Sequence, residues 1–378
     1  MNHLDPRTAI VLTGIMSGLM ALVLYSLQRN YPPSIKGLRE WSLALLLFFI
    51  AGALTAFRSR IPDAFSITMA NLLLSLGMYL AYVGSQIFYG VKPRPVPWLA
   101  LIFIVLLGQI WFTHFEPIYY TRLIQFNLLA ACMFLVHAHL IFKEGLTSFA
   151  RILTFGVMVY MVAIQIMRMV AIFIWPINDG LMDTSPHHLI YITSFAFSIL
   201  LFSIGVVLLA TDKLRTELEH LATHDSLTNA LTRRHMNEIA HSELERCKRS
   251  GRSMALLLID LDHFKKINDS YGHQAGDRVL INFVTRVRAL LRLPDRLGRF
   301  GGEEFVVLLP EASLDEAIQA ANRIRESCAA EAQGPTYTVS IGVSVNQGDA
   351  DTVDAILARA DAAMYRAKSN GRNRVEMG

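Results

Sequence analysis

Apolar residues are distributed unevenly along this 378-residue chain. Long hydrophobic stretches fill the first 210 residues, whereas the rest of the chain alternates short apolar runs with polar segments. A helix needs about 20 apolar residues to cross a bilayer, so each long stretch predicts one membrane span. About seven spans are expected, at residues 9–27, 41–57, 66–89, 98–112, 120–141, 149–175 and 189–210.

Lysine and arginine mark the loops that are expected to face the cytoplasm. They lie in the first, third and fifth loops and just after the last span, at Arg29, Lys36, Arg39, Lys92, Arg94, Lys143, Arg151, Lys213 and Arg215. The fourth loop carries Glu116 and the sixth Asp179 and Asp183, so both should face outward. Arg58 and Arg60, in the second loop, oppose the rule. The pattern predicts a multi-pass protein with its N-terminus outside and its C-terminal domain in the cytoplasm.

A few polar side chains lie within the expected spans, notably Gln125, Gln165 and Arg168. An ionisable group at membrane depth usually faces a bundle interior or a water-filled cavity. Arg168 is expected either to bind an anionic ligand or to snorkel to an interface or pair with a backbone carbonyl. The spans carry too few charged residues for the relay of a pump, which leaves sensing or anchoring as the role of this module.

A short apolar stripe follows the last span. Val207, Leu214, Leu218 and Leu221 recur at intervals of seven, four and three residues, as in the seam of a two-stranded coiled coil. Residues 211–222 are therefore expected to form a signalling helix between a module of residues 1–210 and a domain of residues 223–378. The coiled coil would make a parallel homodimer; the alternative is a helix whose stripe docks on its own domain.

Charge and cysteine content exclude some functions. The net charge is +4, and no lysine- or arginine-rich run is interleaved with aromatic residues, so polymeric nucleic acid is not an expected partner. Cys132, Cys247 and Cys328 are far apart and lack metal-ligand spacing, so they are expected to be packing residues.

The segment 299–305, Arg-Phe-Gly-Gly-Glu-Glu-Phe, is the centre of the C-terminal half. Two glycines between β-prone runs predict a hairpin turn, because glycine reaches positive φ without steric cost. The turn presents Glu303 and Glu304, of which one is expected to hold a divalent metal and the other to handle a proton or a substrate group. Taken alone, the same pattern equally describes a solvated hairpin tip.

A second group of carboxylates follows the apolar run 254–259, at Asp260 and Asp262. A buried strand that ends in carboxylates delivers them to the edge of a sheet, which suits a Mg²⁺ site for a triphosphate. Strand pairing can bring these carboxylates to those of the hairpin.

With these motifs in order, residues 218–375 resemble a GGDEF domain, the diguanylate cyclase family. The resemblance covers the whole C-terminal domain and rests on five segments: 224–228, 260–277, 301–305, 340–343 and 368–373. It implies a bacterial inner-membrane enzyme that condenses two GTP molecules to cyclic di-GMP and releases two pyrophosphates, with one GTP on each domain of a homodimer. The expected fold is an α-helical membrane bundle plus a cytoplasmic α/β domain with a central, mainly antiparallel sheet.

The resemblance assigns the metal site and the catalytic residues. Asp260 and Glu303 would bind Mg²⁺, with Mn²⁺ as an alternative, through their carboxylates, and Leu261 through its backbone carbonyl. Glu303 stands where the family usually has aspartate, and it keeps the charge. Glu304 would assist deprotonation of the ribose 3′-hydroxyl or hold a second metal.

The resemblance also assigns the substrate contacts. Asn268 and Asp277 would read guanine, and the carboxylate favours GTP over ATP because adenine lacks the N1 and N2 donors. The residues implied around the phosphates are Phe264, Lys265, Lys368 and Arg372.

Arg292 and Asp295 match the family's R-x-x-D product-inhibition site, which Arg323 or Arg325 would complete. Arginine suits bidentate contact with phosphate or guanine. The alternative is a surface ion pair without a ligand.

The chain departs from the family at Asn229, Ala230 and Thr232, near the junction with the signalling helix. The departure bears on the tuning of activation more than on catalysis. The competing interpretation of the whole chain is a receptor that binds GTP or cyclic di-GMP without turnover.

Overall fold

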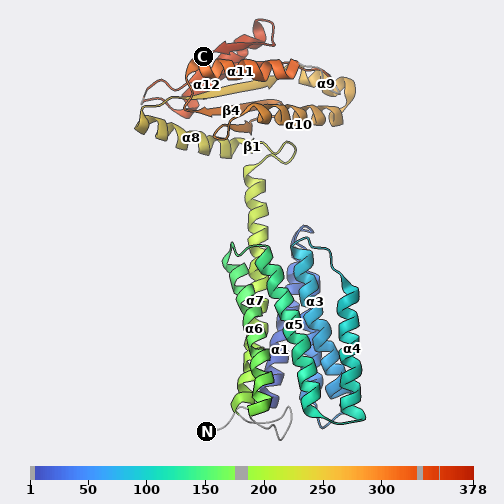
Figure 1. Cartoon of the computed structure of the whole chain (residues 1–378). Coiled ribbons are helices and arrows are strands. Elements are labelled where there is room, and N and C mark those ends of the chain that lie inside the picture. The colour runs from blue at the N-terminus through green and yellow to red at the C-terminus, as the bar shows by residue number, and fades with distance from the viewer. Residues whose placement is uncertain (1–4, 175–185, 330–334, 349) are drawn as a thin grey trace. The chain divides into compact units, whose positions relative to one another are not determined.

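The computed structural model describes residues 5–174, 186–329, 335–348 and 350–378 (Figure 1). Contacts divide the chain into two compact units, Met1–Thr216 and Glu217–Gly378. Each unit has its own hydrophobic core.

The first unit is a bundle of helices. Their bounds are α1 (Pro6–Asn30), α2 (Leu38–Ala56), the π-helix η1 (Ala64–Met69), α3 (Ala70–Phe88), α4 (Pro95–His114), α5 (Tyr119–Lys143), α6 (Phe149–Ile174) and α7 (Pro186–Thr223). Within the described residues, seven helical segments are long and apolar enough to cross a membrane, with η1 and α3 forming one of them. This agrees with the predicted spans. Trp175, the expected end of the sixth span, and Asp179 and Asp183 of the sixth loop lie outside the described residues.

Small residues let α2 and α3 pack closely. Trp41 is fully buried, and its indole Nε1 donates to the carbonyl oxygen of Ala81 at 3.1 Å and to Ser85 Oγ at 3.3 Å. A Cβ atom on Gly84 would lie 2.6 Å from the Trp41 ring, and one on Gly77 would lie 2.5 Å from the ring of Phe48. Glycine is therefore required at both positions, as is common where membrane helices approach closely.

The helix α7 continues past the bundle without interruption. Val207 and Leu214 pack against the core of the first unit, whereas Leu218 is 55% exposed and Leu221 is 62% exposed. In the single chain the last two positions of the apolar stripe therefore remain uncovered.

The second unit contains a six-stranded sheet in the order β1-β3-β4-β2-β5-β6. The strands are β1 (Leu231–Thr232), β2 (Met254–Leu261), β3 (Arg296–Arg299), β4 (Glu304–Pro310), β5 (Val339–Val345) and β6 (Val375–Met377). The pairs β3–β4, β4–β2 and β2–β5 are antiparallel, but the outer pairs β1–β3 and β5–β6 are parallel. The expected mainly antiparallel sheet is wrong: the sheet is mixed, because helical crossovers bring the short edge strands in parallel to their neighbours.

Helices cover both faces of this sheet. They are α8 (Arg233–Ser250), α9 (Phe264–Tyr271), α10 (His273–Leu290), α11 (Leu314–Ala329) and α12 (Val353–Ser369). Alternate residues of β2 join different cores: Leu257 and Ile259 pack with α9, α10 and α11, whereas Leu256 and Leu258 pack with α8 and α12. Since both faces are buried, β2 reads as a continuous apolar run in the sequence.

Two of the residues that depart from the family pattern have identifiable backbone roles. Asn229 has φ +58°, a conformation that asparagine tolerates better than most residues. Thr232 is the N-cap of α8 and accepts a hydrogen bond from the backbone N–H of His235 at 3.4 Å.

Close packing of α12 on β5 generates a stability prediction. A Cβ atom on Gly342 would lie 1.9 Å from the carbonyl oxygen of Ala360, so Gly342→Ala must displace the helix. We expect a loss of at least about 2 kcal/mol in the unfolding free energy of the second unit, measured by pulse proteolysis in urea. Gly302→Ala, where the added Cβ meets open space, is the matched control. Equal stability of the two variants would contradict this packing.

Candidate active site

Asp260 lies near the end of the central strand β2. It pairs in register with Glu304 of β4 on one side and with Ser340 of β5 on the other. Its side chain is buried, and its Oδ2 atom accepts an ion-pair contact from Lys368 Nζ of α12 at 2.7 Å. The apolar strand β2 thus places one carboxylate near its C-terminal end, beside a lysine.

The carboxylates of the hairpin approach the same point. The backbone N–H of Leu261 donates to the Glu303 carbonyl oxygen at 3.3 Å, which extends the β2–β4 ladder into the turn. Burial raises the pKa of Glu303, and the charges of Asp260 and Glu304 raise it further against the opposing effect of Lys368. Burial likewise raises the pKa of Asp260, which Lys368 lowers and Glu304 and Asp262 raise. The site therefore concentrates negative charge.

The expected reason for glycine in the hairpin turn is wrong. Neither Gly301 nor Gly302 has positive φ. A Cβ atom on Gly301 would instead lie 2.8 Å from Glu304 Oε2. Glycine at 301 therefore leaves room for the Glu304 carboxylate to fold closely over the turn.

Arg299 fixes the hairpin to the start of the domain. Its guanidinium donates to the carbonyl oxygens of Gly301 at 3.1 Å and Gly302 at 2.7 Å, and to Asp225 Oδ1 at 2.9 Å. Asp225 also accepts from the backbone N–H and the hydroxyl of Thr228. Although burial acts to raise the pKa of Asp225, these hydrogen bonds and Arg299 lower it overall. Sequence reasoning placed Arg299 and Asp225 in separate motifs and missed their link.

Asp262, which the sequence grouped with Asp260 as a carboxylate of a possible cation site, has a positioning role that sequence reasoning did not predict. It is buried and accepts hydrogen bonds from Thr338 Oγ1 and Ser340 Oγ at 2.7 Å each and from the backbone N–H of Asn373 at 3.1 Å. It thereby ties the end of β2 to β5 and to the loop after α12. Its position two residues after Asp260, on the same side of the strand, was the available signal.

The first turn of α9 lies directly after these aspartates. His263 has φ +59° and precedes the helix, so the chain reverses before Phe264 and Lys265. The backbone N–H groups of a first helical turn have no acceptor within the helix. Phe264 is buried and Lys265 is exposed. The turn therefore offers N–H donors and two exposed cationic side chains, Lys265 and Lys266.

Asn268 packs against Gly276, the residue before Asp277, across the turn between α9 and α10. Asn268 Oδ1 would lie 1.9 Å from a Cβ atom on Gly276, the residue before the exposed Asp277. Glycine at 276 thus allows the amide to pack against the start of α10. The two side chains offer an amide and a carboxylate, the groups expected of a guanine contact.

Two cationic residues, Lys368 and Arg372, lie at the C-terminal end of α12 and in the loop that follows it. Lys368 is at the end of α12 and holds Asp260, as described above. Arg372 is exposed, has φ +60° and donates its backbone N–H to the Ala367 carbonyl oxygen at 2.9 Å. The loop that carries Arg372 is anchored by Asp262 through the neighbouring Asn373.

The donor set fits Mg²⁺. Among the residues that the structure describes, no three histidine, cysteine, aspartate or glutamate side chains converge to hold a metal by themselves. The carboxylates of Asp260 and Glu303 and the carbonyl of Leu261 are hard oxygen donors, and their mutual repulsion favours a cation between them. Such a partial set is typical of Mg²⁺, which usually keeps water and phosphate oxygens in its coordination shell.

Arg292 and Asp295 line a separate cavity, away from the carboxylates described above. The Arg292 backbone N–H donates to Asp295 Oδ2 at 2.8 Å, which folds the turn before β3. The cavity, of about 530 Å³, is also lined by Arg288 and Arg296, which sequence reasoning did not single out. Arg323 lies exposed on α11 and is not part of this lining.

Comparison with known proteins concerns this second unit. Residues 222–374 match the family described as "Diguanylate cyclase, GGDEF domain". The response regulator PleD of Caulobacter vibrioides is 43% identical over 175 residues, which cover 44% of this chain and 38% of PleD. The diguanylate cyclase DgcM of Escherichia coli is 43% identical over 165 residues, which cover 43% of this chain and 40% of DgcM.

Solved structures match the same region. The coiled coil and GGDEF domain of DgcB from Caulobacter crescentus, in complex with c-di-GMP, is 27% identical with a TM-score of 0.42, and the match covers 46% of this chain and 97% of that one. The matches to PleD and DgcM span about two fifths of the length of those relatives. Residues 222–374 are therefore a GGDEF domain with strong similarity to those of diguanylate cyclases.

Proposed function

We propose that the whole chain is a membrane-bound diguanylate cyclase. It condenses two GTP molecules to cyclic di-GMP and releases two pyrophosphates. Residues 1–210 form a sensory module, 211–222 a signalling helix and 223–378 the catalytic domain, which lies on the cytoplasmic side of the inner membrane. The observation that carries this proposal is the buried Asp260, paired with Lys368 at 2.7 Å and in register with Glu304.

Asp260, Glu303 and the Leu261 carbonyl would hold Mg²⁺, with Mn²⁺ as the alternative. When bound, the cation neutralises charge on the triphosphate and on the pyrophosphate that leaves. Lys368, already paired with Asp260, adds a second positive charge beside the phosphates. Lys265, Arg372 and the first-turn N–H groups of α9 bind the remaining phosphate oxygens.

Glu304 is the candidate proton acceptor. Its carboxylate folds over the hairpin at Gly301, close to the charges of Asp260 and Glu303. It takes the proton of a ribose 3′-hydroxyl while that oxygen bonds to the α-phosphorus of the other GTP. The bond from the α-phosphorus to the oxygen that bridges to the β-phosphate breaks, and pyrophosphate leaves. The second linkage forms in the same way.

Asn268 and Asp277 select guanine. The Asp277 carboxylate accepts hydrogen bonds from the N1 and N2 groups of guanine, and Asn268 can both donate and accept. Adenine leaves the carboxylate without donors, so ATP is discriminated against.

The active form is a homodimer. One domain binds one GTP, and the reaction needs the α-phosphorus of each nucleotide to face the 3′-hydroxyl of the other. The exposed Leu218 and Leu221 offer an apolar stripe through which a second copy can pair.

Product inhibition is assigned to the hollow around Arg292 and Asp295. Arg292 can bind phosphate or guanine, and Asp295 can accept from guanine donors. Arg288 and Arg296 add positive charge in the same cavity. Arg323 of α11 is the further proposed contact.

The direct test is incubation of the full-length protein in detergent with GTP and Mg²⁺, with products identified by mass spectrometry. Cyclic di-GMP and two equivalents of pyrophosphate are expected, and a chelator should abolish both. If GTP binds without turnover at concentrations where a dimer is present, the protein is a receptor and the proposal fails.

Removal of one metal-binding charge should stop turnover. Glu303→Gln keeps the size of the side chain, and we expect product formation to fall by at least about 100-fold because the cation loses a ligand. Glu245→Gln, exposed on α8, is the matched control and should keep full activity. Turnover near the native rate in Glu303→Gln would contradict the assigned role.

The dimer can be tested through its apolar stripe. Leu218→Asp buries a charge in the proposed seam, so both dimer content by light scattering and turnover should fall by at least about tenfold. Thr216→Asp places the same charge on the opposite face of α7 and should change neither. A Leu218→Asp protein that stays dimeric would show that the helix is not the dimer contact.

Product inhibition predicts a distinct behaviour for Arg292→Ala. Its reaction should continue after the native protein slows, because product no longer binds in the hollow; product accumulation over time is the measurement. Arg249→Ala, an exposed arginine on α8 outside the cavity, should slow like the native protein. Identical slowing of both variants would remove Arg292 from an inhibitory site.

A further inference from the structure

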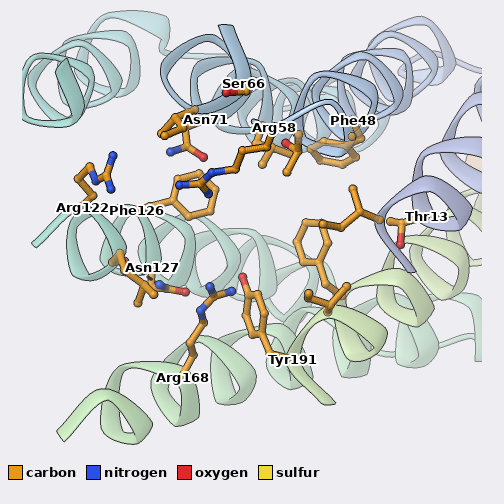
Figure 2. A pocket seen from close by; sticks show the side chains of 18 of the residues that line it. Thr13, Phe48, Arg58, Ser66, Asn71, Arg122, Phe126, Asn127, Arg168 and Tyr191 are labelled. Carbon is orange, nitrogen blue, oxygen red and sulfur yellow. Dashed lines mark hydrogen bonds between the residues drawn. The ribbon is translucent and has the colours of Figure 1, made fainter. Parts of the chain in front are cut away.

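The membrane unit contains a cavity of about 170 Å³ between its helices. Three arginines line it, from different parts of the chain: Arg58 after α2, Arg122 in α5 and Arg168 in α6. Figure 2 shows the side chains of Arg58 and Arg168 extending into the cavity from opposite sides. The cavity thus gathers cations at the end of the bundle that is predicted to face outward.

Among the side chains that the structure describes around this cavity, the charged ones are all positive. Among the described lining residues there is no aspartate or glutamate. Asp63 acts electrostatically on Arg122, but it is exposed and outside the lining. Arginine stays protonated in proteins, so the charge cannot be removed by loss of a proton. A buried cation without a partner costs several kcal/mol, which an anion in the cavity would offset.

Buried hydrogen-bonding atoms also lack partners there. Arg168 is 91% buried, and its Nε atom has no acceptor; the same holds for Nε of Arg122. The guanidinium of Arg168 stacks 3.6 Å from the ring centroid of Tyr191, which fixes its plane. Asn127, 1% exposed, leaves its Oδ1 atom without a donor. The residues around the cavity therefore have two unpaired donors, Nε of Arg168 and of Arg122, and one unpaired acceptor, Oδ1 of Asn127.

Most of the remaining lining side chains are apolar, although Thr13, Thr55, Ser66, Asn71, Gln109 and Tyr119 also line the cavity. Phe48, Phe126 and Phe195 contribute aromatic rings, and Ile10, Leu74 and Ile199 contribute aliphatic side chains. A hydrated inorganic anion gains little from such walls, whereas an apolar body buries its surface against them. Since a cavity of roughly 150 Å³ admits benzene, the space suits a ligand of about ten non-hydrogen atoms.

From this lining we propose that the membrane unit binds a small carboxylate with an aromatic or aliphatic body. Its carboxylate lies between Arg58, Arg122 and Arg168, and its body lies against the phenylalanines. This role would explain why Arg58 lies in the second loop, where the positive-inside rule disfavours an arginine, because its side chain points into the cavity. Arg60, two residues later, is exposed and outside the lining.

The chain supplies its own reporter for the test. All four tryptophans, at positions 41, 98, 111 and 175, precede the GGDEF domain, so tryptophan fluorescence follows unfolding of the membrane unit alone. Thermal unfolding of the full-length protein in uncharged detergent is measured with benzoate, phenylacetate or hexanoate. Benzyl alcohol, inorganic phosphate and the anionic lipid phosphatidylglycerol are the comparison probes. This readout is independent of any enzymatic activity.

At least one of the carboxylates should raise the melting temperature, with benzyl alcohol and phosphate without effect. Arg168→Gln should weaken its binding by at least about tenfold, because a charged hydrogen-bond partner is lost. Arg60→Gln is the matched control and should bind as the native protein does. Ligand-free Arg168→Gln should melt no lower than the native protein, since it removes an unpaired buried charge.

Several outcomes would overturn the proposal. They are no stabilisation by any carboxylate, equal stabilisation by phosphate, stabilisation by phosphatidylglycerol alone, and equal loss of binding in Arg60→Gln and Arg168→Gln. If Arg168→Gln does not fold, Arg122→Gln replaces it, with the same expected loss of binding.

Discussion

The catalytic unit depends on negative charge that its sheet concentrates at one point. The apolar strand β2 is buried on both faces and carries Asp260 near its C-terminal end. The hairpin places Glu303 and Glu304 beside this end of the strand. Burial and mutual repulsion raise the pKa of both Asp260 and Glu303, and Lys368 offsets part of this cost. The arrangement is costly for the folded chain alone, and a divalent cation with a triphosphate relieves it.

Two aspartates, the buried Asp262 and the partly buried Asp225, fix the backbone around these charges. Asp262 joins β2, β5 and the loop of Arg372, and Asp225 joins the start of the domain to the hairpin through Arg299. Asp225 follows the end of α7 by two residues. A displacement at the end of this helix can therefore reach the hairpin turn through one ion pair and two hydrogen bonds, which provides a physical connection between the end of α7 and the site.

The sequence predicted what depends on local pattern and missed what depends on distant partners. Seven spans follow from the length of apolar runs, and Asp260 from the end of a buried strand. The mixed sheet was missed because β1 and β6 are two and three residues long, too short for an alternation to be visible. The contacts of Arg299 and Asp262 were missed, and Arg168 was the one cavity arginine singled out as a possible anion contact, because these groups join segments far apart in the chain.

The claim that the carboxylates form a cation-dependent GTP site is tested most directly by calorimetry. A non-hydrolysable GTP analogue is titrated into the full-length protein with Mg²⁺ and again with a chelator, and the matching ATP analogue serves as comparison. We expect the GTP analogue to bind at least about tenfold more weakly without the cation, and the ATP analogue to bind weakly in both conditions. Equal affinity for GTP with and without Mg²⁺ would contradict the account.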